Sequence, residues 1–203
     1  MRREHFEIAG VLLALLLHFV LTRGVGIRGL DVIPLTLLVL TYALWRGRAG
    51  EVRAAWGTRS GGFWQCFAAS GALFAFGTAI CAGIGWQRGH LAVDLHLAIT
   101  LLLYPLWGIA QQFLVLALFA NGLDRLGLPR AAVLAVATLG FGAAHVPNWQ
   151  LVAATLVLGA WCTVLFFRHR NLWPLGLAHG VLGALFYRWV LGVDVCVAMF
   201  TPR

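Results

Sequence analysis

Long apolar runs separated by short polar segments dominate the hydrophobic pattern of the chain. A bilayer core about 30 Å thick needs about 20 apolar residues in a membrane-spanning helix. Seven runs approach this length, at residues 6–22, 30–45, 63–86, 94–122, 131–145, 151–167 and 172–191. We therefore predict an all-α protein, a polytopic transmembrane helix bundle of about seven spans, with residues 1–203 forming a single membrane domain.

The fourth run, residues 94–122, is the longest. As one straight helix it would extend about 43 Å at a rise of about 1.5 Å per residue. This length exceeds the bilayer core, so the helix must tilt or break. We predict a kink at Pro105, because proline removes a hydrogen bond from a helix interior.

Composition supports the membrane class. Hydrophobic residues make up 61% of the chain and charged residues only 11%, and the mean hydropathy is +0.87, whereas a soluble domain is about 25% charged. The net charge of +8 comes from arginines that lie between the apolar runs. There they orient a protein in the bilayer, so the expected partner is the lipid bilayer and not nucleic acid. The cysteines, which lack C-x-x-C spacing, are predicted to be small core residues: Cys66, Cys81, Cys162 and Cys196.

The arginines also predict an orientation. With the N-terminus inside, ten lie in cytoplasmic segments: Arg2, Arg3, Arg46, Arg48, Arg53, Arg59, Arg125, Arg130, Arg168 and Arg170. Four lie outside, at Arg23, Arg28, Arg88 and Arg203, and Arg188 falls within the last run. The positive-inside rule therefore predicts N-in and C-out. In the basic segment after the second run, Trp56 is expected at the membrane interface.

Three polar features interrupt the later apolar runs: the pair Gln111 and Gln112, then His145, then His179. An ionisable residue at membrane depth is a functional-site hypothesis by default. Counted from the cytoplasmic ends of their spans, Gln111 lies at a depth of about 16 Å, His145 about 21 Å and His179 about 11 Å. We predict that these groups line one cavity. Adjacent helical residues point about 100° apart, so both glutamines are not expected to face one point.

The order of these features resembles that of the CPBP family, the CAAX prenyl proteases and bacteriocin-processing enzymes, over residues 102–189. The family pattern is E-E-x-x-x-R, then F-x-x-x-H, then H-x-x-x-N. The second motif is intact here, from Phe141 to His145. The other two motifs depart from the pattern, with Gln111 and Gln112 at the two glutamates, Leu116 at the arginine, and Gly183 at the asparagine that follows His179.

The resemblance implies an intramembrane endopeptidase that acts on a membrane-associated or lipid-modified protein. In the family a glutamate activates water, but glutamine has no titratable group and cannot be a general base. His145 or His179 would then have to be the base, because imidazole titrates near neutrality. We expect His145 to orient or activate water, His179 to stabilise the oxyanion, and Gln111 or Gln112 to donate hydrogen bonds.

The replaced glutamates leave a second interpretation open, a catalytically inactive membrane scaffold with the family fold that binds a lipid or a partner helix. A small transporter is disfavoured because the chain has no inverted repeat. No cofactor is expected, and a divalent metal is a minor option, because two histidines and a glutamine oxygen make a poor zinc ligand set. The expected location is the bacterial inner membrane, with the N-terminus inside.

Overall fold

The computed structural model describes residues 3–21, 32–59 and 61–198 of the chain. Helices joined by short connections make up this part, which contains no strand, so the predicted all-α class is confirmed. The helices are α1 (Arg3–Phe19), α2 (Val32–Arg46), α3 (Gly50–Ala55), α4 (Phe63–Arg88), α5 (Leu95–Gln112), α6 (Asn121–Arg125), α7 (Arg130–Ala143), α8 (Trp149–His169), α9 (Trp173–Leu185) and α10 (Val195–Ala198). Two π-helical segments, η2 (Phe113–Ala120) and η3 (Phe186–Val190), extend α5 and α9.

The number of spans differs from the prediction. Among the described residues, three helices are long and apolar enough to cross a membrane: Phe63–Arg88, Leu95–Arg125 and Trp149–His169. The other predicted spans form shorter helices, of 17 residues in α1, 15 in α2, 14 in α7 and 13 in α9. The predicted ends of the first two spans, at residues 22 and 30–31, lie outside the described residues. The fold therefore supports a membrane bundle, while the count of about seven spans is not confirmed.

The longest run changes its helical geometry after the glutamine pair. Pro105 lies inside α5, which continues in α-helical geometry to Gln112. The π-helical segment η2 begins at the next residue. The change of geometry therefore lies downstream of the predicted kink position. π-Helical segments are rare and frequently lie at functional sites.

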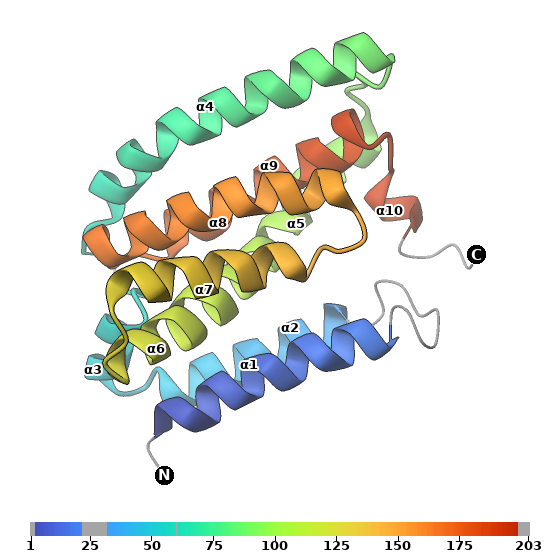
Figure 1. Cartoon of the computed structure of the whole chain (residues 1–203). Helices are drawn as coiled ribbons and strands as arrows, with labels where there is room; N and C mark the ends of the chain where they lie inside the picture. The colour runs from blue at the N-terminus through green and yellow to red at the C-terminus, as the bar shows by residue number, and fades with distance from the viewer. Residues whose placement is uncertain (1–2, 22–31, 60, 199–203) are drawn as a thin grey trace.

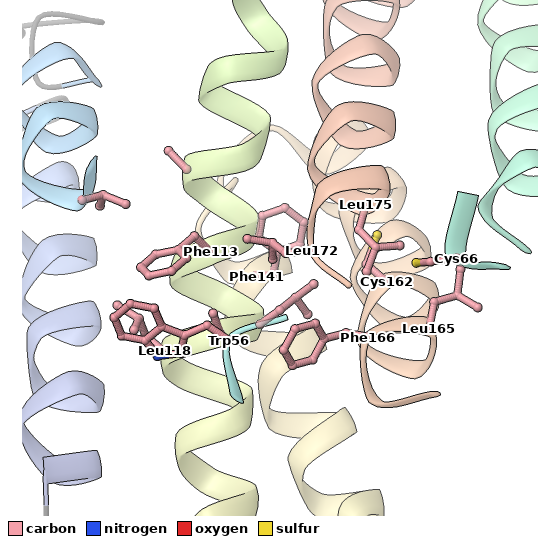
Figure 2. Packing of buried hydrophobic residues seen from close by; sticks show 14 of the residues in the cluster. Trp56, Cys66, Phe113, Leu118, Phe141, Cys162, Leu165, Phe166, Leu172 and Leu175 are labelled. Atoms are coloured by element: carbon pink, nitrogen blue, oxygen red, sulfur yellow. The ribbon is translucent and has the colours of Figure 1, made fainter. Parts of the chain in front are cut away.

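Figure 1 shows α1 and α2 on one side of the bundle and α4 on the opposite side, with α5, α7, α8 and α9 between them. The most extensive helix contact joins α5 to α9, and α7 packs on α8. A buried cluster between these helices forms the core (Figure 2). Cys66, Cys81 and Cys162 are buried free thiols, as predicted, and the side chain of Cys196 lies outside the described part.

Trp56, expected at the membrane interface, lies in this core and is only 1% exposed. Its ring meets Phe113 edge-on at a centroid distance of 5.0 Å (Figure 2). The chain after α3 turns into the bundle, where the Leu172 backbone N–H donates to the Gly57 carbonyl at 2.8 Å. The interfacial prediction for Trp56 was therefore wrong, because a tertiary contact that local sequence does not encode covers the ring.

Tertiary contacts gather most arginines at one end of the bundle. Arg125 pairs with Glu4 at 3.1 Å, and Arg170 hydrogen-bonds Asn121 at 2.8 Å. Among the described residues this end holds Arg3, Arg46, Arg48, Arg53, Arg59, Arg125, Arg130, Arg168 and Arg170, and the opposite end holds Arg88 and Arg188. Arg2, Arg23, Arg28 and Arg203 lie outside the described residues.

At the opposite end, charged side chains connect the start of α5 to the segment after η3. Arg188 pairs with Asp94 and, at 3.1 Å, with Asp194, which also lies 2.7 Å from His96 Nδ1. A hydrogen bond from the Leu97 backbone N–H, together with the charge of Arg188, lowers the pKa of Asp94. Burial opposes ionisation of Asp194, but hydrogen bonds and nearby positive charges outweigh it and lower its pKa.

Candidate functional site

Glycines bring α5 and α9 into backbone contact. A Cβ atom built on Gly180 would lie 2.3 Å from Pro105 Cα, and one built on Gly176 would lie 2.7 Å from Ile109 Cα. Gly108 faces Gly180 in the same way, with its Cβ position 2.5 Å from the Gly180 nitrogen. Such close approach is the usual role of small residues at four-residue spacing in membrane helices. It places His179, between the two α9 glycines, directly against α5.

His179 meets the second glutamine of the pair. Gln112 Nε2 lies 3.1 Å from His179 Nδ1, and both side chains are buried. The His179 ring also hydrogen-bonds the Gly108 backbone. Gln112 Oε1 has no hydrogen-bond partner among the described residues. Exchanging the amide oxygen and nitrogen would leave the nitrogen unpaired instead, and a buried unpaired polar group costs about 1–3 kcal/mol.

A backbone carbonyl one helical turn away fixes the tautomer of His145. Its Nδ1 lies 2.9 Å from the Phe141 carbonyl oxygen. A carbonyl can only accept a hydrogen bond, so Nδ1 carries the proton and Nε2 of the neutral ring keeps its lone pair. Nε2 makes no hydrogen bond with a described residue, and His145 lines the main cavity. The free lone pair can therefore accept a proton or a hydrogen bond from a molecule in the cavity.

Phe141 lies between the two histidines. Its ring meets His145 edge-on at a centroid distance of 5.2 Å and His179 at 5.3 Å. Such edge-to-face arrangements are a favoured geometry for aromatic pairs. The first residue of the F-x-x-x-H motif thus orients both imidazoles.

The cavity itself has a volume of about 930 Å³ and a mostly apolar lining. Gln111, His145 and His179 all line it, while Gln112 lies behind His179. The structure thus brings the predicted residues together and separates the two glutamines. Among the described residues, no aspartate or glutamate lines the cavity, and no group of three or more metal-ligating side chains occurs.

Sequence reasoning assigned no site role to two polar residues of this cavity. His18, from α1, lines it, and its position deep in an apolar run was a signal for this. Tyr104 lines it beside Gly183, where a Cβ would lie 2.9 Å from Tyr104 Cε1. The tyrosine ring therefore takes the room that an asparagine at position 183 would need, and its hydroxyl hydrogen-bonds no described residue. No sequence signal pointed to Tyr104.

The fold and the cavity define an integral membrane protein with a buried histidine site. Residues 92–185 match the family model described as Rce1-like, type II CAAX prenyl endopeptidase. This match supports membership in the CPBP family and confirms the resemblance found in the motifs. Over these residues the chain is similar to CAAX-protease-type membrane proteins. Comparison with curated proteins and with solved structures gave no match.

Proposed function

We propose that this protein hydrolyses a peptide bond in a membrane-associated or lipid-modified protein, and that His145 is the general base. One observation carries the proposal. The His145 Nδ1–H donates to the Phe141 carbonyl, so the Nε2 lone pair is free at the cavity. This arrangement supplies the proton acceptor that the glutamines cannot provide.

In the proposed reaction, a water molecule attacks the carbonyl carbon of the scissile bond and gives a proton to His145 Nε2. The carbonyl oxygen becomes an oxyanion, which hydrogen-bond donors in the cavity stabilise. Gln111 supplies an amide N–H, and Tyr104 supplies a hydroxyl beside Gly183. The carbon–nitrogen bond then breaks, and His145 returns the proton to the leaving amine, so that one acid and one amine are released.

Two of the predicted roles change in this proposal. His179 was expected to stabilise the oxyanion, but its ring is engaged by Gln112 and by the Gly108 backbone. We assign it a positioning role, together with Gln112. The apolar lining of the cavity suits an extended lipid-modified or hydrophobic segment, and its volume falls in the usual range for ligand sites.

A catalytically inactive scaffold is the second candidate function. The absence of a carboxylate among the described lining residues favours it, since the remaining groups bind but offer only histidine as a base. In this case the cavity would hold a lipid or a partner helix without cleaving it. We expect slow cleavage if the first proposal is right, because imidazole alone replaces the family carboxylate.

The test is cleavage of a prenylated peptide by the full-length protein reconstituted in vesicles, followed by mass spectrometry. His145→Ala should lower the rate about 10² to 10⁴-fold, the usual contribution of a positioned general base. His5→Ala is the matched control, because His5 is exposed and is not a lining residue of the cavity. Cleavage that survives His145→Ala would refute the assignment. Binding of the peptide without cleavage would favour the scaffold.

We also propose that the arginine-rich end faces the cytoplasm of a bacterial cell, with the N-terminus inside. Nine of the eleven described arginines at one end support this orientation. A reporter fused after Arg203 tests it. Activity only outside the cytoplasm is the expected result, and a cytoplasmic signal would overturn either the orientation or the odd number of spans.

A further inference from the structure

A groove, smaller than the histidine cavity, lies at the arginine-rich end, between the first turn of α7 and the last turn of α8. Its volume is about 420 Å³. Arg130 and Arg168 line it from the two helices, and the remaining lining is largely apolar, with Leu134, Val164 and Phe167. It shares no lining residue with the histidine cavity.

The charges around this groove do not balance. Arg125 is paired with Glu4 at 3.1 Å. Asp124 is shared by two arginines, lying 3.6 Å from Arg130 and 3.4 Å from Arg170. Arg168 is exposed and forms no hydrogen bond or ion pair with any described residue. One carboxylate thus faces three guanidinium groups, which leaves an excess of two positive charges.

Arg130 is held in position for a ligand. Its guanidinium lies 5.5 Å from the centroid of the Phe167 ring, a distance typical of a cation–π contact. The contacts with Phe167 and Asp124 restrict the conformations of the side chain before any ligand binds. Less conformational entropy is then lost when an anion is bound.

An exposed apolar surface continues from the groove along α7 and α8. Val164 is 51% exposed, Leu139 63% and Val157 60%. On a membrane helix such a surface meets acyl chains. A soluble anion would use the arginines alone, whereas a phospholipid would use the arginines and this apolar surface together.

We propose that the groove binds an anionic phospholipid, with the headgroup phosphate between Arg130 and Arg168 and an acyl chain along the apolar surface of α7 and α8. Basic residues at the membrane surface attract anionic lipids by about 1 kcal/mol each, which corresponds to about fivefold in affinity. The two arginines together then give a preference of about thirtyfold for an anionic headgroup over a zwitterionic one.

Native mass spectrometry of the full-length protein in neutral detergent tests the site, with phosphatidylglycerol and phosphatidylcholine as the two probes. Arg168→Gln should lower phosphatidylglycerol affinity about fivefold, and Arg130→Gln combined with Arg168→Gln about thirtyfold. Phosphatidylcholine affinity should change much less, because its choline cation offsets the charge of the phosphate. Arg168→Gln removes no hydrogen bond or ion pair with a described residue, and the side chain is exposed, so the fold should be unaffected.

Arg48→Gln is the matched control, since Arg48 is exposed at the same end of the bundle and its substitution removes the same charge. An equal loss with Arg48→Gln would overturn the site in favour of a general charge effect. Glycerol 1-phosphate is the second arm. If it displaces phosphatidylglycerol at equal concentration, the groove is a soluble-anion site and the lipid proposal fails. Neither result depends on peptidase activity.

Discussion

Gln112 and His179 form a buried polar contact at the α5–α9 interface, with 3.1 Å between Gln112 Nε2 and His179 Nδ1. The preceding residue, Gln111, lines the cavity that His145 also lines. Adjacent helical positions point about 100° apart, which accounts for the different surroundings of the two glutamines. Gln112 contacts His179 within the helix interface, while Gln111 lines the cavity.

The different surroundings of Gln111 and Gln112 predict different effects for the same substitution at the two positions. Gln111→Glu puts a carboxylate into the cavity that the proposed base also lines, where it can accept a proton, so peptide cleavage should rise at least about tenfold. Gln112→Glu puts a charge where the side chain is fully buried, so the protein should lose thermal stability without gaining activity. Cleavage assays and thermal unfolding of both variants check this. Faster cleavage by Gln112→Glu than by Gln111→Glu would contradict it.

A second prediction concerns the position where the family has asparagine. A Cβ on Gly183 would lie 2.9 Å from Tyr104 Cε1, so Gly183→Asn should destabilise the protein by about 1–3 kcal/mol through overpacking. Tyr104→Ala makes room for the new side chain, and the double variant should recover part of the loss. Unfolding of both single variants and the double variant completes a mutant cycle, with an expected coupling of about 0.5–3 kcal/mol.

Additive effects in that cycle would show that Tyr104 and residue 183 do not compete for space. Activity gives a separate readout. Tyr104→Phe keeps the ring and removes only the hydroxyl, so it should slow cleavage with little change in stability if the hydroxyl stabilises the oxyanion.

The sequence was sufficient to predict the helical class and three polar residues of the cavity, because both depend on strong local signals. Polar residues inside apolar runs marked Gln111, His145 and His179, and helix depth placed them at comparable levels. The span count was harder, because run length alone does not reveal where a helix ends. The fifth run was predicted to continue to residue 145, but α7 ends at Ala143 and the chain turns before Asn148 caps α8.

Tertiary contacts account for what the sequence did not reveal. Trp56 is covered by Phe113 and Tyr42, which lie far from it in the chain. Tyr104 of α5 lines the cavity where it packs against Gly183 of α9, across the close contact of the two helices. Neither contact follows from hydrophobic periodicity, which reports the faces of one helix at a time.

The glycine contact leads to a third prediction. Gly180→Ala places a Cβ 2.3 Å from Pro105 Cα, and backbone cannot yield as a flexible side chain can. The helices would have to separate, so we expect a stability loss of about 3 kcal/mol. The same separation would lengthen the Gln112–His179 contact and slow cleavage.

Gly71→Ala in α4 is the control, because nothing lies within 4 Å of its Cβ position. Alanine has the higher helix propensity, so this variant should be as stable as the wild type or up to about 1 kcal/mol more stable. If both alanine variants have the same unfolding temperature, the α5–α9 contact is not the constraint described above.

The last prediction concerns pH and the charged group formed by Asp94, Arg188, Asp194 and His96. The pKa values of Asp94 and Asp194 are lowered in the folded protein, so the folded state binds fewer protons than the unfolded state at acidic pH. Their contribution to stability is therefore complete above the ordinary carboxyl pKa of 3.8 and is lost as the pH falls through the lowered values.

Asp194→Asn should lower the unfolding temperature by about 1–4 °C at pH 7, and the difference from wild type should shrink below pH 4. Glu51→Gln, at an exposed position with no ion pair to a described residue, should leave the unfolding temperature unchanged at both pH values. A difference between wild type and Asp194→Asn that persists undiminished in acid would mean that the Asp194 charge does not stabilise this end of the bundle.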